Sequence, residues 1–277
     1  MQFRKVTKNQ PYRKIPTSLS VKNFDLFVLP HLSYGAKSGP KPKISAHKMF
    51  NYILFVLHTG CQWKALKKCI DKDHNGNREI HYTSVFKQFK KWSNDGSLKR
   101  VFENSVLCLH QSNLLDLSVL HGDGTTTAAK KGGDNIGFNG HKHFKGEKVV
   151  AITDRNGNVL SPYTTAPGNK NESPLFADAL GKLKGIIKQI GASIVGSIMS
   201  LDGVYDSNKN RKLIFNANMT PNIPENKRNR QNNKPGPMFS WEDKFKRALI
   251  RFERISAHHF GVKLIAYSMI NLRHLCI

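Results

Sequence analysis

The sequence predicts an α/β protein with two parts, a helical region over residues 1–113 and a mixed β-sheet with flanking helices over residues 114–277. Three observations support this prediction. Apolar residues recur at helical spacing in the first part, near-continuous apolar runs and a hairpin signal follow residue 114, and strand-like and helical segments then alternate. The length of 277 residues is enough for one large domain or for two smaller domains with buried cores.

The first part begins with a basic, proline-bearing segment and continues into two predicted helices. Ser45 is a good N-cap for a helix over residues 46–58, whose apolar residues share one face. Gly60 ends this helix, and residues 62–68 (QWKALKK) form a short second one.

A third helix is predicted over residues 84–92 (SVFKQFKKW), with Thr83 as its cap. Trp63 and Trp92 are interpreted as core residues. The lysines of the third helix, Lys87, Lys90 and Lys91, lie away from its apolar side. This order of helix, turn, helix, loop and basic helix fits a DNA-binding helix-turn-helix arrangement. It fits a small helical bundle with solvated lysines equally well.

The second part begins with strands. Residues 114–123 (LLDLSVLHGD) form an apolar run that ends in an acid. Residues 148–154 and 158–166 flank the tripeptide Arg-Asn-Gly, which is typical of a hairpin turn because glycine accepts the positive φ that such turns need. Ser173, followed by proline, is expected to cap a helix that ends at Gly191.

The remaining segments complete an alternating pattern. A buried strand is predicted over residues 193–203, with Asp202 at its end, and a short strand over residues 219–224. A basic loop over residues 225–237 follows, and the last segment, from Trp241 to Cys276, has helical periodicity. The order fits a mixed sheet with helices packed on it.

The charge of the chain indicates a polyanionic partner. Forty-four Lys and Arg against nineteen Asp and Glu give a formal net charge of +25 and a pI of about 10.0. Nucleic acid is the usual polyanion for such a protein, although ribosomal and membrane-surface proteins share this composition. The 39% of hydrophobic residues indicates a globular protein and excludes a disordered basic tail.

The cysteines and the apolar segments predict a soluble, cytoplasmic protein. The four cysteines form no CxxC pair and are interpreted as reduced thiols. The first residues, MQFRKVTKNQPYRK, lack the apolar core of a signal peptide. The longest apolar stretch, residues 49–57, is too short to span a membrane.

Two acids stand beside glycine at the ends of apolar runs, Asp123 in HGDG and Asp202 in LDGVYD. A strand holds its terminal carboxylate with little freedom, which favours a magnesium site. Two adjacent carboxylates raise each other's pKa unless a divalent cation lies between them. Such a centre can act on a phosphodiester. Taken singly, each acid is explained as well by a turn-capping role, since Asp-Gly is a common turn pair.

Several long blocks of this chain together resemble the DDE transposases of bacterial insertion sequences. The blocks are HGDGTTTAAKKGGDNIGFNGHKHFKGEKVVAITDRNGNVL, TTAPGNKNESPLF, SLDGVYDSNKNRK and WEDKFKRALIRFERISAHHFG, in the order of the family. LPHLSYGAKSGPKPK and SVFKQFKKW resemble the helical DNA-binding region of the same proteins. The resemblance covers nearly the whole chain.

This resemblance implies a ribonuclease-H-like fold over residues 114–277 and a DNA-binding domain over residues 1–113. It also implies magnesium- or manganese-dependent cleavage and joining of double-stranded DNA at inverted repeats, by a homodimer on the DNA, associated with the bacterial nucleoid. Asp123 and Asp202 match the two catalytic, metal-binding aspartates of the family. Asp206 matches a second aspartate of the same block and is interpreted as a helix cap.

The resemblance also suggests residues that contact DNA. His141, Lys142, His143 and Lys145 precede the second strand and are candidate phosphate contacts, or equally a solvated basic loop. Lys227, Arg228 and Arg230 lie in the basic loop and are expected to bind phosphate without sequence preference.

The chain departs from the family at the third acid. The family has a catalytic Glu shortly before the tryptophan that matches Trp241, and here that stretch reads NKPGPMFSW, without an acid. Glu242 is the nearest carboxylate and the candidate third acid, although it matches a position after the tryptophan. Glu253 matches a later position and is interpreted as part of a structural ion pair. An alternative function is therefore a remnant transposase that binds DNA without cutting it.

Overall fold

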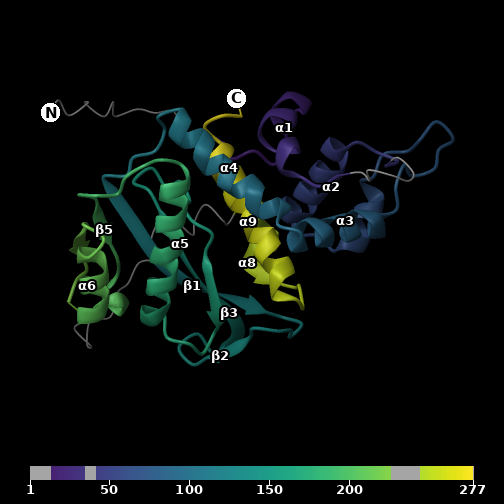
Figure 1. Ribbon diagram of the computed structural model, residues 1–277. Helices are drawn as coiled ribbons and strands as arrows, with labels where there is room; N and C mark the ends of the chain where they lie inside the picture. The colour runs from purple at the N-terminus through teal and green to yellow at the C-terminus, as the bar shows by residue number, and fades with distance from the viewer. Residues whose placement is uncertain (1–13, 35–41, 226–243, 277) are drawn as a thin grey trace.

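The computed structural model describes residues 14–34, 42–225 and 244–276 (Figure 1). In the N-terminal region, capping residues determine where the helices begin and end. Helix α2 (Ala46–Thr59) begins where the Ser45 hydroxyl accepts a hydrogen bond from the backbone N–H of Lys48, and it ends at Gly60, whose φ of 70° is left-handed. Both boundaries confirm the predicted helix. The other elements of this region are α1 (Val21–Phe27), η1 (Leu29–His31), η2 (Trp63–Lys68), α3 (Tyr82–Asn94) and α4 (Ser97–Gln111).

The short helix predicted over residues 62–68 is present as a 3₁₀ helix over residues 63–68. The predicted start of the third helix was wrong, because α3 begins two residues earlier. Its N-cap is His81, whose imidazole accepts from the backbone N–H of Thr83, so Thr83 lies inside the helix. An imidazole acceptor is an uncommon cap, because Ser, Thr, Asp and Asn usually occupy this position.

The sheet of the described part of the chain has seven strands. Strands β3 (Phe144–Thr153) and β1 (Val119–Ala129) are antiparallel, and β4 (Thr164–Pro167) is antiparallel to β3. Strands β5 (Ile198–Ser200) and β6 (Thr220–Asn222) continue the sheet on the other side of β1, parallel to it. The short strands β2 (Gly137–Asn139) and β7 (Ile250–Arg251) pair with β3 and β1. Three antiparallel strands followed by two strands parallel to the first make the ribonuclease-H-like arrangement that was predicted.

The sequence pattern accounts for the centre of this sheet. The run from residue 146 to residue 153 is buried throughout, as expected for a central strand covered on both faces. The hairpin after it was predicted correctly, because Gly157 has a φ of 75° and Thr153 pairs with Val159. Strand β1 differs from its prediction. It begins at Val119 and runs to Ala129, so Asp123 lies within the strand and not at its end.

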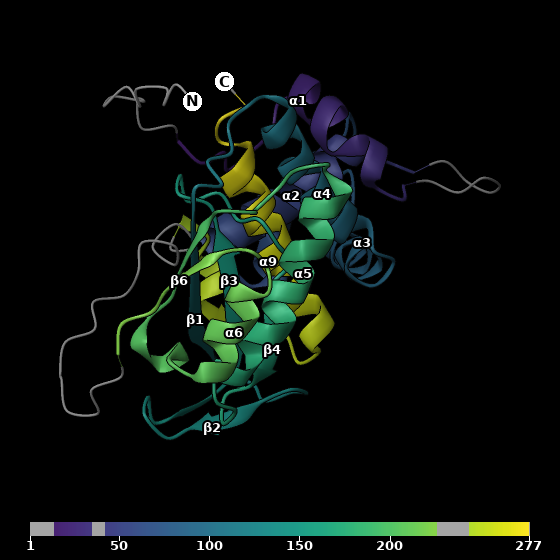
Figure 2. The same ribbon diagram turned by 60° about the vertical axis from the view of Figure 1, so that its left-hand side comes forward.

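Helix α5 (Phe176–Gln189) lies along the sheet, and α6 (Asn208–Phe215) lies beside it (Figures 1 and 2). Ser173 does not cap α5 as predicted. It begins the short 3₁₀ helix η3 (Ser173–Leu175) that leads into α5, and Glu172 occupies the position before it. Glu172 contacts the sheet, since its Oε1 lies 3.2 Å from the Nζ of Lys148 on β3.

The C-terminal segment joins the two parts of the chain. It was predicted to be helical throughout, but it forms α8 (Lys246–Leu249), strand β7, and α9 (Ser256–Leu272), which packs along α4 and α3 (Figure 1). The Asn271 amide accepts from the backbone N–H of Val159 at 2.9 Å and donates to Ser105 Oγ at 3.0 Å. The hairpin and α4 are therefore linked through α9. None of the helices in the described ranges has the length and hydropathy needed to cross a membrane.

Candidate active site

Asp123 lies at the point where β1 extends beyond its parallel neighbour. Strand β5 pairs with β1 only from Val119 to His121, and Ser200 is opposite His121. Asp123 itself pairs with Ala151 of β3 on the other side. Its Oδ1 accepts a hydrogen bond from the backbone N–H of Gly124 at 2.7 Å. The carboxylate is thus held at the C-terminal end of the parallel pair, which is where ligands bind in open α/β sheets.

Asp202 follows β5 at the same end of the sheet. It precedes the 3₁₀ helix η4 (Gly203–Tyr205), and its Oδ1 accepts from the backbone N–H of Val204 at 3.1 Å. The turn-capping role considered for this acid is therefore real. Backbone hydrogen bonds from Val204 and Tyr205 both act to lower the pKa of this carboxyl group.

Glu172 is a third carboxylate at this end of the sheet, and sequence reasoning missed it. Its Oε1 lies 3.2 Å from the Nζ of Lys148, on β3. A Cβ added to Gly124 would lie 2.6 Å from Glu172 Oε2 and 2.8 Å from the hydroxyl oxygen of Tyr205. A side chain at position 124 would displace Glu172 and Tyr205, because both pack directly on the glycine backbone. The glycine after Asp123 was the one sequence signal of this close approach.

The acids influence one another electrostatically. Burial, the charges of Asp202 and Glu172, and a counteracting hydrogen bond from Gly124 together raise the pKa of Asp123 to about 6. Burial and then the charge of Glu172 raise the pKa of Asp202. The positive charge of Lys142 opposes the shift at Asp123. The site therefore carries more negative charge than its own cations neutralise.

Tyr205 is a further polar group of the site. Its side chain is 0% exposed and packs edge-on against Phe176 of α5, with ring centroids 6.1 Å apart. Its hydroxyl has no hydrogen-bond partner among the described residues. Burial and then the charges of Glu172, Asp123 and Asp202 raise its pKa, so the hydroxyl remains protonated.

These residues fit a divalent metal ion. The donors are carboxylate oxygens with one buried hydroxyl, which suits a hard cation such as magnesium or manganese. The buried Tyr205 hydroxyl has no hydrogen-bond partner among the described residues and is a polar group that the water shell of such an ion could satisfy. Among the described residues, no group of three acids, histidines or cysteines is already arranged to hold a metal. The residues that would hold an ion here are therefore the pair Asp123 and Asp202.

Of the predicted phosphate contacts, Lys142 has an electrostatic effect on an acid of the site, Asp123. It lies in the exposed turn between β2 and β3, close enough to Asp123 to affect its pKa. Asn139 fixes this turn, because its Oδ1 accepts from the backbone N–H groups of His141 and Lys142 while its amide donates to Thr126 Oγ1 at 2.9 Å. The other residues proposed from this segment, His141, His143 and Lys145, are exposed.

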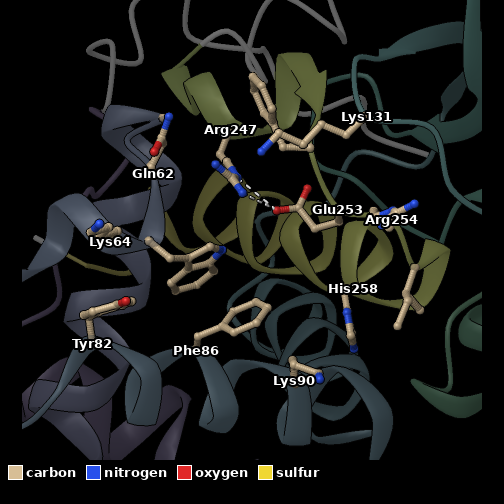
Figure 3. A pocket seen from close by; sticks show the side chains of 14 residues that line it. Gln62, Lys64, Tyr82, Phe86, Lys90, Lys131, Arg247, Glu253, Arg254 and His258 are labelled. Carbon is tan, nitrogen blue, oxygen red and sulfur yellow. Dashed lines mark hydrogen bonds and ion pairs between the residues drawn. The ribbon is translucent and has the colours of Figure 1, made fainter.

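The lysines of α3 lie elsewhere. Lys87 and Lys91 are exposed, whereas Lys90 lines a pocket of about 720 Å³ between the helical region and the C-terminal segment (Figure 3). Trp63 also lines this pocket and packs on Phe86, with ring centroids 5.1 Å apart, so it is only partly a core residue. Trp92 is fully buried, which confirms its predicted role.

Two of the remaining predicted residues form ion pairs, and the others lie outside the described part of the chain. Glu253 forms an ion pair of 2.7 Å with Arg247, as predicted (Figure 3). Asp206 pairs with Arg211 at 2.8 Å, and Ser207 caps α6, so the cap role predicted for Asp206 was wrong. The following residues lie outside the described part of the chain: Lys227, Arg228, Arg230 and Glu242.

Comparison with known families identifies the class of protein. Residues 113–265 match the family model described as "Transposase DDE domain". Because this match covers more than half of the chain, the protein belongs to the family of transposases with a DDE domain. No curated protein matches the chain.

The solved structures that match this chain are those of transposases. The "Mos1 transposase paired-end complex with left transposon end" matches at a TM-score of 0.28 and 11% identity, over 68% of this chain and 61% of that one. The "piggyBac transposase synaptic complex with hairpin DNA" matches at 0.40 and 11%, over 73% and 48%. The "catalytic domain of Mos1 mariner transposase" matches at 0.31 and 10%, over 61% and 88%. The chain thus spans less than two thirds of the first two structures.

Proposed function

We propose that this transposase binds the ends of an insertion sequence as duplex DNA and catalyses their metal-dependent cleavage and strand transfer. The observation that carries the proposal is the convergence of Asp123 and Asp202 at one end of the sheet, from strands that are distant in the sequence. The raised pKa of Asp123 supports a cation at this point. Magnesium or manganese is the ion that this oxygen donor set favours.

Each residue then has a definite role. Asp123 and Asp202 hold the metal, which when bound activates the attacking oxygen and stabilises the leaving oxygen of a phosphodiester. Lys142 contacts a phosphate close to Asp123 and aligns the strand to be cut. The excess of 44 basic over 19 acidic residues attracts the DNA backbone in general, and Lys87 and Lys91 are exposed for such contacts. Action as a homodimer on the DNA, in the cytoplasm, is part of the proposal.

One observation favours a second candidate function, DNA binding without cleavage. The stretch that corresponds to the family's third acid, residues 234–241, contains no acid. If no other carboxylate supplies the third metal ligand, the protein binds DNA but does not cleave it. A nicking assay on plasmid carrying the flanking inverted repeats, with manganese, separates the two functions: nicking supports the transposase activity, and binding without nicking supports the remnant.

DNA binding by the wild-type protein should weaken steeply with salt, and Lys142→Ala should reduce that dependence. Each phosphate contact contributes a slope of about −0.9 to the logarithm of affinity against the logarithm of salt concentration. Loss of Lys142 is therefore expected to make the slope shallower by about one unit. Fluorescence anisotropy with duplex DNA at several salt concentrations measures this.

The matched control for that experiment is Lys184→Ala, which removes one positive charge from an exposed position of α5. A change of slope that is equal in the two variants would mean that Lys142 makes no specific phosphate contact. A flat salt response of the wild-type protein would remove nucleic acid as the partner.

A further inference from the structure

We propose that the pocket between the helical region and the C-terminal segment binds one unpaired nucleotide of the DNA. The base lies among the aromatic rings of the pocket, and the neighbouring phosphates contact the lysines around it. The proposal rests on the proposed function in one respect, that DNA is the partner of this protein. It concerns a site apart from Asp123 and Asp202, and it involves no metal.

The walls of the pocket are held together by Arg247, which is 6% exposed. Its guanidinium donates through Nη2 to Glu253 Oε1 at 2.7 Å and through Nη1 to the backbone oxygen of Cys61 at 3.3 Å. Cys61 leads into η2, and Glu253 lies shortly before α9. These contacts hold η2 against the C-terminal segment, so the cavity of about 720 Å³ is present before any ligand binds. Binding sites for small ligands commonly have such a volume.

Aromatic residues from both regions line this cavity: Trp63, Tyr82, Phe86 and Phe252. Trp63 is fixed in place, because its ring packs on Phe86 and on Phe89, with centroids 5.1 and 5.2 Å away. All four lining residues are nevertheless partly exposed. The ammonium of Lys90 lies 5.7 Å from the centroid of the Phe86 ring, so a cation and a ring are adjacent. Ordered, partly exposed rings offer a flat apolar surface on which any DNA base can stack.

Lysines without acidic partners lie around these rings. Lys64 comes from η2, Lys90 from α3 and Lys131 from the segment after β1, and Figure 3 shows them on different sides of the pocket. In the part of the chain that the structure describes, none of the three forms an ion pair with a carboxylate. Glu253, the acid of the lining, is already paired with Arg247. The cavity therefore has an excess of positive charge that the phosphates of a DNA strand neutralise.

Backbone hydrogen bonds on either side place Lys131 at the pocket. The N–H of Lys130 donates to the backbone oxygen of Arg251 at 3.2 Å, and the N–H of Asp134 donates to that of Arg254 at 3.0 Å. The segment after β1 is thus fixed along β7 and the residues that follow it. The position of this lysine is therefore set by the fold.

Strand β1 connects the pocket to the metal site. Asp123 lies within β1, and Lys131 follows its last residue, Ala129, by two positions. The chain from Asp123 to Lys131 spans at most roughly 26 Å when extended. Duplex DNA rises about 3.4 Å per base pair, so this span corresponds to no more than about eight base pairs. One DNA molecule can therefore contact both sites.

The test compares two DNA strands of equal charge, because the contributions of base and phosphate must be separated. The full chain, without metal, is titrated with a thymidine strand of about twelve nucleotides and with an abasic strand of the same length, by fluorescence anisotropy. A single strand presents unpaired nucleotides without the cost of opening a duplex. The wild type should bind the thymidine strand about tenfold more tightly, through the stacking of one base. Equal affinities would show that only the backbone crosses the pocket and would overturn the proposal.

Trp63→Leu should remove most of this preference for the base-bearing strand and leave the affinity for the abasic strand as it is in the wild type. The matched control is Phe215→Leu on α6, whose ring is 73% exposed and does not line the pocket. This control should keep the full preference. If Trp63→Leu keeps it as well, the proposal is overturned.

Tyr82→Leu decides the matter if Trp63→Leu does not fold. Tyr82 is partly exposed and is the first residue of α3, so its replacement leaves the packing of Trp63 on Phe86 in place. We expect the preference for the thymidine strand to fall several-fold. A preference equal to that of the wild type would count against a base in this pocket and overturn the proposal.

Lys131→Gln tests the contact with phosphate. It should weaken the binding of both strands and make the salt dependence shallower, by about 0.7 in slope for one contact with a single strand. The control is Lys184→Gln, which removes one charge from an exposed position of α5. Equal effects of the two variants would overturn the assignment of a phosphate to Lys131.

The failure of this inference can be told from the failure of the proposed function. If the wild type binds neither strand and no duplex DNA, the proposed function itself is wrong. If it binds duplex DNA with a steep salt dependence but has equal affinity for the two single strands, the proposed function stands and the pocket does not hold a nucleotide.

Discussion

Asp123→Asn and Asp202→Asn are each expected to lower the rate of metal-dependent DNA cleavage on the order of a thousandfold, which corresponds to about 4 kcal/mol of transition-state stabilisation. The amide retains the shape of the side chain but is a poor ligand for a hard cation. DNA binding should change little, because the excess positive charge of the chain is unaffected. Single-turnover cleavage of end-containing DNA with manganese measures the effect, and Asp178→Asn is the control.

The same Asp123 substitution should stabilise the metal-free fold. In the folded state the pKa of Asp123 is raised from 3.8 to about 6, by burial and by Asp202 and Glu172, so ionisation opposes folding. The wild type should therefore lose stability as the pH rises from about 4 to about 6, and Asp123→Asn should lose less. Above pH 6 the variant should be more stable by roughly 1 to 3 kcal/mol, after allowance for partial exposure. Urea unfolding at pH 4 and pH 7 tests this, and equal stability of the two proteins at pH 7 would contradict it.

Glu253→Ala should destabilise the fold by about 3 to 5 kcal/mol, the usual cost of leaving a buried charge without its partner. Arg247 donates to Glu253 Oε1 through Nε at 2.9 Å and through Nη2 at 2.7 Å, and both side chains are almost completely buried. The pair joins α8 to the start of α9, at the wall of the pocket in Figure 3. Urea unfolding measures the loss, with Glu103→Ala as the control, since the Lys99–Glu103 pair is longer, at 3.6 Å, and its lysine is exposed.

The Glu253 contribution should also depend on pH. Burial acts to raise the pKa of Glu253, but the interaction with His259, whose Nδ1 lies 3.7 Å from Oε2, and the charge of Arg247 outweigh it and lower the pKa from 4.5 to about 2. A lowered folded-state pKa gives stability that is complete above about pH 4.5 and is lost as the pH falls toward 2. This loss amounts to about 3 kcal/mol. The difference in stability between the wild type and Glu253→Ala should shrink over this range, and a constant difference would show that the charge of Glu253 is irrelevant.

The sequence predicted those parts of the site that depend on local pattern. Asp123 and Asp202 were recognised because each stands beside glycine after an apolar run, and α2 was recognised because Ser45 and Gly60 specify its ends. The ribonuclease-H-like fold was predicted from several blocks in a fixed order, and the strand topology confirms it. Catalytic and DNA-binding roles remain proposals for these residues.

Other features could not be read along the chain. Glu172 is separated from Asp123 by 49 residues, and only the folding of β3 and β4 back onto β1 brings it to Gly124. Strand β7 has two residues and no pattern of its own, so its pairing with Ala128 and Ala129 depends on tertiary contacts alone. Asp206 looked like a cap in sequence, but Arg211 competes for its carboxylate and Ser207 takes the capping position.

The most direct test of a metal centre formed by Asp123 and Asp202 is anomalous X-ray diffraction from a crystal of the protein soaked in manganese. We expect a strong anomalous peak between the carboxylates of Asp123 and Asp202, with oxygens of both at about 2.0 to 2.4 Å from the ion. Absence of a peak at saturating manganese, or a peak whose ligands include neither aspartate, would contradict this expectation.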